Sequence, residues 1–346
     1  MTIKMTILLI GCVMIAGGLL LHFVQSRSAS ARESALNSKF KKLKEIQKQQ
    51  AVAAQEKIER SKIDLKQQTD DAVAAVKALS LPAALAELTS DSPNSSEQSR
   101  IGGPVYLPEN TPYPVDNAGA PMLFLTQINF AEMPAIPGFP AQGILQLFAR
   151  ADEELGIETN ERPAQRVIHF WDHVSDLTTR HDAISVHTDM LIYKKRWVDG
   201  KQDTSKAEHI HINGRKLKFQ ASLTDIIPSS TYEYPVPHHL GDKFKEHVHL
   251  DDHVGEIIQE LNPIAPVMIG GYPRFAQSDP RFTVTNYAKF MEQMMVQETE
   301  YTRVLLNMNS VDDLMIWDAG SLNILIRPED LEKKYFGNII YEIAGH

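Results

Sequence analysis

An internal repeat in the C-terminal part of the chain is the feature that most constrains its fold. The first copy opens at Ile101-Gly102-Gly103-Pro104 and closes at Gly143–Arg150. The second copy opens at Ile269-Gly270-Gly271 and closes at Gly320–Arg327. Because the segments recur in the same order, the repeat predicts two similar β-rich halves packed about a pseudo-twofold axis.

Short apolar runs within each copy have the length of buried β-strands. In the first copy these runs are Met122–Phe130, Gly143–Ala149 and Arg166–Trp171, and in the second they are Val304–Asn309, Gly320–Arg327 and Asn338–Glu342. The predicted fold class is therefore α+β, with two similar β-rich halves and only short helices inserted between strands.

The segment between the copies predicts an inserted hairpin and short helices. Asn213-Gly214 separates alternating runs within His209–Phe219, which is the strongest short-range hairpin pattern. Asp252–Leu261 has one apolar face and ends before a proline, as a short helix does. Thr285–Thr299 predicts a second, methionine-rich helix.

The N-terminal residues Met5–Val24 form an apolar run without a charged side chain. As a helix it spans ~30 Å, the thickness of a bilayer core. We therefore expect a single-pass anchor in a bacterial inner membrane. A cleaved signal peptide and a lipoprotein cleavage site at Leu9–Cys12 are the alternatives. Positive residues flank both ends, so the charges barely decide orientation; the periplasmic side is slightly favoured for the soluble part.

Residues 26–88 are rich in Ala, Gln, Glu and Lys and predict a long amphipathic helix. Apolar residues recur at heptad spacing, namely Ala51, Ile58, Leu65, Ala72 and Leu79. The expected structure is a helical stalk or weak coiled coil, with weak self-association because alanines occupy part of the seam. Residues 89–99 predict a flexible linker by composition.

Composition excludes several classes of function. The formal net charge of −9 argues against a nucleic-acid-binding surface, which is normally basic. Cys12 is the single cysteine and lies in the apolar run. Disulfides within the chain, zinc sites made of cysteines and a thiol nucleophile in the soluble part are thereby excluded.

Several separated motifs together resemble the YwqG-like family of uncharacterised bacterial proteins. They are Ile101–Gly103 followed by Pro112-Tyr113-Pro114, then Pro137–Pro140, Gly271-Tyr272-Pro273, Gln277–Arg281 and Asp318–Asn323. The resemblance covers about residues 99–346 and implies an α+β fold of two related halves, here 101–172 and 266–346 with an insert at 173–265. It implies no activity, catalytic residue or cofactor. Relatives beside toxin genes imply an immunity role for some members.

Amide side chains within apolar strands are the first candidate site, since buried amides need hydrogen-bond partners. These residues are Gln127, Gln146, Asn307 and Asn323. They predict either amide-to-backbone bonds that join the two halves or a small polar ligand held at their junction. Asp279 and Arg281 are further candidates for ligand binding, with a local turn-stabilising pair as the alternative.

Histidines provide the second candidate site. His247, His249 and His253, with acidic residues between them, have the composition of a metal site. The alternative is that these are surface or structural histidines. No catalytic motif with a hydrolase or nucleotide-binding pattern occurs in the chain.

Three functions follow as hypotheses. The first is a membrane-anchored, non-enzymatic binding protein that neutralises a partner, such as a bacterial toxin, through an acidic surface. The second is an envelope ligand-binding or sensing domain with a small polar ligand between its halves. The third is a metal-dependent hydrolase that uses His247, His249 and His253.

Overall fold

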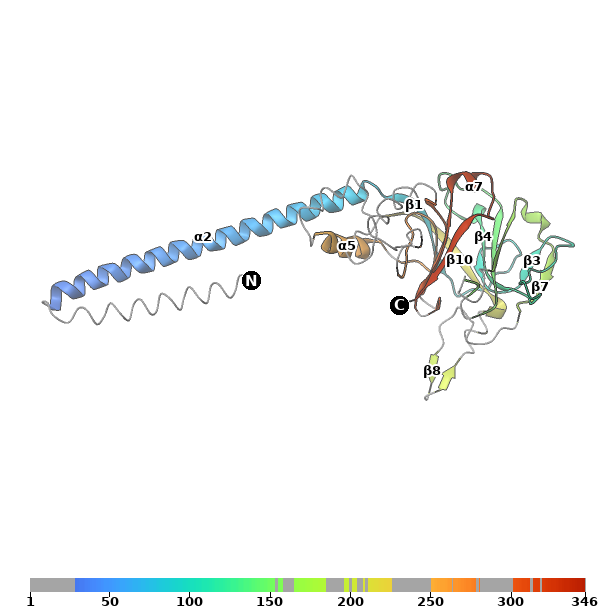
Figure 1. Ribbon diagram of the computed structural model, residues 1–346, viewed down its shortest axis with the longest axis horizontal. Helices are drawn as coiled ribbons and strands as arrows, with labels where there is room; N and C mark the ends of the chain where they lie inside the picture. The colour runs from blue at the N-terminus through green and yellow to red at the C-terminus, as the bar shows by residue number, and fades with distance from the viewer. Residues whose placement is uncertain are drawn as a thin grey trace. The chain divides into compact units, whose positions relative to one another are not determined.

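The computed structural model describes most of the chain after residue 28. The described residues are 29–152, 155–157, 165–184, 196–198, 201–203, 208, 211–225, 250–262, 264–277, 280, 301–311, 314–317 and 319–345. The chain divides into two compact units, Met1–Gln68 and Thr69–His346. The second unit contains all of the described β-strands, several of which are labelled in Figure 1.

One ten-stranded antiparallel sheet organises the second unit, with strand order β14-β13-β12-β11-β1-β10-β2-β4-β5-β6. In chain order its strands are β1 (Leu81–Leu88), β2 (Arg100–Ile101), β4 (Leu123–Asn129), β5 (Ile144–Ala149), β6 (Arg166–Trp171), β10 (Arg215–Thr224), β11 (Val267–Gly270), β12 (Arg303–Asn309), β13 (Ser321–Ile326) and β14 (Ile339–Ala344). The strands of the two meanders, β4-β5-β6 and β12-β13-β14, lie within a few residues of their predicted ranges.

The structure describes several further elements outside this sheet. They are the strand pairs β3 (Val105–Leu107) with β7 (Thr179–His181) and β8 (Arg196–Val198) with β9 (Lys201–Asp203), the helices α2 (Ala29–Lys77), α5 (Leu250–Leu261) and α7 (Pro328–Glu332), and the 3-10 helices η1 (Phe130–Glu132) and η2 (Val174–Asp176). Helix α5 begins two residues before its predicted start, and its Val254 and Ile258 are buried, as its apolar face requires.

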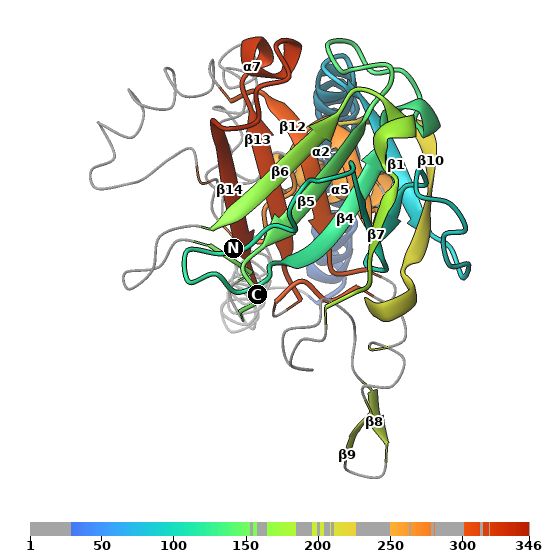
Figure 2. The same ribbon diagram turned by 90° about the vertical axis from the view of Figure 1, so that its right-hand side faces the viewer.

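The sheet curls into a half-barrel, so that its two ends enclose one core. Leu145 and Leu147 of β5 belong to the same buried cluster as Leu322 and Ile324 of β13. Figure 2 shows the green strands β4–β6 in front of the red strands β12–β14. Burial of each such side chain contributes about 1.5–3 kcal/mol, so this shared core holds the curl.

The predicted fold class is wrong. One continuous sheet with few helices replaces two halves packed on each other, and β1 and β10 pair along their lengths in its middle, from Leu81 opposite Thr224 to Leu88 opposite Leu217. Strand β1 lies in the range assigned to the helical stalk. Its sequence favours a helix, but pairing with both β10 and β11 and burial of Ala83–Ala86 override that propensity.

The predicted coiled-coil stalk is not supported. Helix α2 is a single long helix that ends at Lys77. Its larger apolar side chains in the first unit are about half exposed, with Phe40 at 53% and Leu65 at 56%. A coiled coil buries such a seam against a second helix, and no described helix covers this one.

The predicted inner-membrane localisation is also corrected. Within the part of the chain that the structure describes, no helix combines the length and apolarity needed to cross a bilayer. Helix α2 is long enough, but it carries many charged residues, each of which costs about 2.5–3.5 kcal/mol at a bilayer centre. The predicted anchor itself, residues 5–24, lies outside the described residues.

The predicted hairpin at Asn213-Gly214 is wrong as well. Residues 211–213 are helical, and β10 starts directly after Gly214 and pairs with β1 and β2 instead. Gly214 has a φ of +75° and packs on Gly103, whose N–H donates to the His211 carbonyl at 2.9 Å. Here glycine permits close contact between two backbones rather than a two-residue turn. The helix predicted at residues 285–299 lies outside the described residues.

A buried carboxylate links the end of α2 to the sheet. Asp225, directly after β10, is 1% exposed and accepts hydrogen bonds from Lys77 Nζ, Ser80 Oγ and Asn262 Nδ2. Burial alone would raise the pKa of Asp225, but these hydrogen bonds outweigh burial and hold the pKa below its ordinary value. Asn262 follows α5, so the carboxylate also holds that helix in place.

We expect Asp225→Asn to lower the free energy of unfolding by about 1–3 kcal/mol at pH 7, because Lys77 loses its charged acceptor. A carboxylate whose pKa is lowered by folding contributes stability above its unfolded pKa of about 3.9 and loses it as pH falls below that value. The difference between wild type and variant should therefore shrink below about pH 4. Urea denaturation from pH 7 to pH 3 measures it. Asp182→Asn, at a largely exposed carboxylate, is the control, and an equal pH dependence in both variants would contradict the assignment.

Candidate functional site

Arg100 in β2 is a fully buried arginine at 0% exposure. It lies opposite Gln127 of β4, and its Nη2 donates to Gln127 Oε1 at 3.1 Å and to the Pro104 carbonyl at 3.0 Å. Its Nη1 donates to the carbonyls of Ser96 at 3.2 Å and Gln98 at 3.0 Å. Arg100 therefore fixes the segment before β2 and the loop after it on the outer face of the sheet.

The groups in direct contact with the Arg100 guanidinium are neutral. Its guanidinium carbon lies 5.3 Å from the centroid of the Tyr106 ring and 5.7 Å from that of Phe124. Among the described residues, Arg100 makes no ion pair, and its Nε is buried without a hydrogen-bond partner. Burial lowers the pKa of Arg100 to about 10, although Tyr106 and Glu132 act in the opposite direction. The side chain thus remains positively charged at neutral pH.

A cavity of about 270 Å³ adjoins Arg100. Its polar lining includes Ser92, Ser95, Arg100, Tyr106, Arg180, Asp182 and Asn213, and its apolar lining includes Pro93, Pro104 and Ile212. Arg180 also pairs with Asp182 through Nη2 and Oδ1 at 3.0 Å, and both side chains are well exposed. The space is large enough for several waters or one small molecule. We name it the Arg100 cavity.

One wall of the Arg100 cavity comes from residues 89–99, the segment predicted as a flexible linker. Gln127 Nε2 donates to the carbonyls of Ser96 at 2.8 Å and Gln98 at 3.0 Å. Ser99 N donates to Glu132 Oε2 at 2.7 Å, and Asn129 Nδ2 donates to the Glu97 carbonyl at 3.1 Å. Several hydrogen bonds to η1 and β4 thus hold this segment, and the cavity is largely pre-formed.

The structure brings the predicted amides together in two separate pairs. Gln146 Nε2 donates to Gln127 Oε1 at 2.9 Å, and Asn307 Nδ2 donates to Asn323 Oδ1 at 2.8 Å. All four are fully buried. The pairs lie in different meanders, and no hydrogen bond found among the described residues links one pair to the other. Each pair instead binds the loop that covers its own meander.

Those covering loops accept the remaining amide protons. Gln146 Nε2 donates to the Tyr106 carbonyl at 2.8 Å, and Asn323 Nδ2 donates to the Arg274 carbonyl at 2.9 Å. Asn323 Nδ2 also reaches the buried Glu342 Oε2 at 2.9 Å. Gln127 and Gln146 therefore support the Arg100 cavity from beneath, while Asn307 and Asn323 hold the loop at the other end of the sheet.

The other predicted site residues are not brought into a described site. Asp279, Arg281, His247 and His249 lie outside the described residues, and His253 lies in α5, where its side chain is outside them too. In the part of the chain that is described, no three His, Cys, Asp or Glu side chains are grouped closely enough to hold a metal ion.

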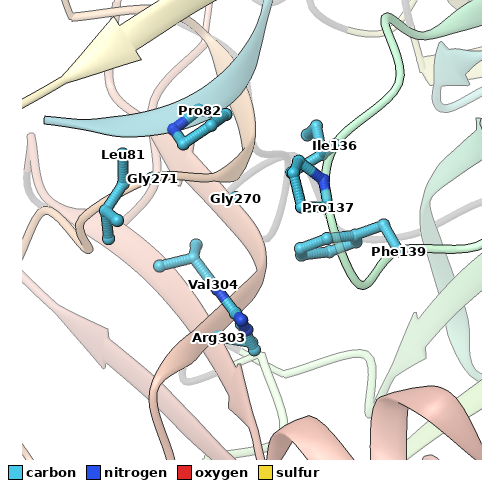
Figure 3. Close-up of a pocket in the computed structure, with 9 residues that line it drawn as sticks. All are labelled: Leu81, Pro82, Ile136, Pro137, Phe139, Gly270, Gly271, Arg303 and Val304. Carbon is cyan, nitrogen blue, oxygen red and sulfur yellow. The ribbon is translucent and has the colours of Figure 1, made fainter.

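A second, much smaller cavity of about 30 Å³ lies beside Gly270 and Gly271 (Figure 3). Ile136, Pro137 and Phe139 line it opposite β1, and Arg303 and Val304 complete it. This volume is about that of one water molecule in the liquid. A Cβ on Gly271 would lie 2.2 Å from Thr224 Oγ1, so this glycine serves close packing and leaves no space for a phosphate group.

Arg100, Tyr106 and Arg180 are not among the site residues predicted from the sequence. Arg100 directly precedes the repeat and follows a polar segment, where an arginine is normally exposed. Only the pairing of β2 with β4 places it opposite Gln127, and only the pairing of β3 with β7 places Tyr106 opposite Arg180. Both pairings join residues that are far apart in the sequence, so a local sequence pattern cannot predict them.

The fold and the Arg100 cavity define a half-barrel β-domain with a polar cavity of ligand size. The chain belongs to the family described as Domain of unknown function (DUF1963), which it matches over residues 99–344. No curated protein matches the chain. The family boundary falls next to Arg100, whereas β1, which lies in the middle of the sheet, precedes it.

Proposed function

We propose that this DUF1963 domain is a non-catalytic binding domain that holds a small polar ligand in the Arg100 cavity. The observation that carries the proposal is a cavity of about 270 Å³ with a buried arginine in its lining and walls held by buried amides. Largely pre-formed cavities with a few converging polar groups are the usual form of small-molecule sites.

The proposed ligand site differs from the one inferred from the repeat. That inference placed a ligand at the junction of two halves, whereas the amides are already bonded in pairs within each meander. The Arg100 cavity lies on the opposite face of the sheet from the shared core, next to the first pair. Gln127 and Gln146 thus support the ligand site in this proposal without contacting the ligand.

Thermal unfolding of the full chain in the presence of a panel of small polar molecules tests this function. A ligand at 100 times its Kd stabilises a protein by about 2.7 kcal/mol, which corresponds to roughly 5–10 °C in Tm. We expect such shifts in the wild type and their loss in Ser95→Trp, which places an indole at the cavity mouth. Ala118→Trp, at an exposed turn outside the cavity, is the matched control. Shifts that survive in Ser95→Trp, or no shift with any compound, would contradict the proposal.

The finer assignment to the YwqG-like proteins forms part of this proposal, and the ordered motifs from Gly102 to Asn323 support it. Neutralisation of a toxin through protein contact stays a prediction, since no described feature tests it. The metal-dependent hydrolase also stays a prediction, because His247 and His249 lie outside the described residues.

A further inference from the structure

We infer that the ligand of the Arg100 cavity is a small monocarboxylate, with one negative charge on a compact apolar body. This inference rests on the proposed function and specifies the chemical class of its ligand. It depends on three properties of the cavity: its net charge, the hydrogen-bond donors in its lining, and its apolar wall.

The lining carries one uncompensated positive charge. Arg180 and Asp182 form an ion pair, so their charges cancel. Arg100 remains, with neutral hydrogen-bond acceptors and aromatic rings around it. Glu132 contributes a weaker attraction, while its Oε2 accepts from Ser99 N and makes no ion pair with Arg100. A buried charge without a counterion is unfavourable, and an anion in the cavity would offset it.

The available donors fit a singly charged anion. The terminal nitrogens of Arg100 already donate to four protein acceptors, so Arg100 acts on a ligand mainly through its charge. Direct donors come from the hydroxyl groups of Ser92, Ser95 and Tyr106, which have no protein partner among the described residues. One net positive charge with neutral donors favours a carboxylate over a doubly charged phosphate, which is best bound by several cationic groups or a helix N-terminus.

The remaining lining accommodates an apolar body. Pro93, Pro104 and Ile212 face the cavity, and Ile212 is partly exposed there. The volume of about 270 Å³ equals that of roughly nine liquid waters, which suits an acid of about benzoate size. A larger acid would have to extend through the mouth beside Ser95.

Calorimetric titration of the full chain with benzoate, its neutral analogue benzamide, and inorganic phosphate tests this inference at low salt. We expect benzoate to bind at least tenfold more tightly than benzamide, and phosphate to bind more weakly than benzoate. Asp182→Asn should tighten benzoate binding about threefold, because it frees Arg180 from its acidic partner at an exposed site. Benzamide binding should not change in this variant.

Glu87→Gln is the matched control, since it also removes one exposed carboxylate from an ion pair, here with Lys218 at 3.5 Å, outside the cavity. It should leave benzoate binding unchanged. Equal binding of benzoate and benzamide, tighter binding of phosphate, or weaker benzoate binding in Asp182→Asn would overturn the inference. If neutral compounds alone bind and Ser95→Trp abolishes that binding, the proposed function stands without the carboxylate. If nothing binds, both are overturned.

Discussion

Replacing Arg100 by methionine is expected to lower the free energy of unfolding by about 3–5 kcal/mol, because four buried or half-buried acceptors each lose a hydrogen bond from a charged donor. Three of them are the carbonyls of Ser96, Gln98 and Pro104, and the fourth is Gln127 Oε1. Methionine fills a similar volume, so the cost comes from lost hydrogen bonds rather than from a cavity. Urea denaturation of the full chain measures this loss.

Arg180→Met is the matched control for this prediction, because the same substitution there changes an arginine whose side chain is 58% exposed. We expect a change within about 0.5 kcal/mol. Proteolysis provides a second measurement: residues 93–99 should become susceptible in Arg100→Met and stay protected in Arg180→Met. Equal stability of the two variants would show that Arg100 does not hold this segment.

The strands of both meanders could be predicted because their apolar runs are local and long enough to be read from the sequence. Strand β1 could not, since Leu-Pro-Ala-Ala-Leu-Ala-Glu-Leu continues the helix-favouring composition of α2. What decides its structure is pairing with β10 and β11, which come much later in the chain. The prediction of separate halves failed for the same reason: β1 and β10 join the meanders into one sheet.

The candidate site, like the fold, could be predicted only where the local sequence determines it. The sequence shows that Gln127 and Gln146 are amides in apolar strands, which is enough to expect buried hydrogen bonds. It does not show their partners, because these depend on the register of β4 against β5 and on the loop above them. The burial of Arg100 is even harder to predict from the sequence. It depends on contacts with residues 89–99, whose polar composition is typical of a linker.

The two meanders share a register shift and a buried amide pair, but the charged residue beside the amide pair differs between them. Each has a register shift in its first strand, between Phe124 and Thr126 in β4 and between Val304 and Leu306 in β12. Each then places an amide pair beneath a covering loop. The first pair lies beside a cation, Arg100, and the second beside an anion, Glu342. The ligand cavity occurs at the end of the sheet that carries the buried cation, Arg100.

Asn323→Leu is expected to lower the free energy of unfolding by about 2–4 kcal/mol, because it removes a donor from a carboxylate in a buried site. Asn323 Nδ2 donates to Glu342 Oε2 and to the Arg274 carbonyl, both at 2.9 Å. Gln146→Leu in the other meander removes hydrogen bonds among neutral groups only, and we expect a smaller loss of about 1–3 kcal/mol. Urea denaturation of both variants compares them.

The double variant Asn323→Leu, Glu342→Leu tests how much of the loss in Asn323→Leu arises from the Glu342 carboxylate and how much from the Arg274 loop. Removing both partners of a buried polar contact can be nearly neutral, whereas removing one leaves the other with its desolvation cost. We therefore expect the double variant to regain part of the stability that Asn323→Leu loses, a coupling of about 1–2 kcal/mol. If the two substitutions simply add, the amide does not stabilise Glu342, and the loss in Asn323→Leu arises from the Arg274 loop instead.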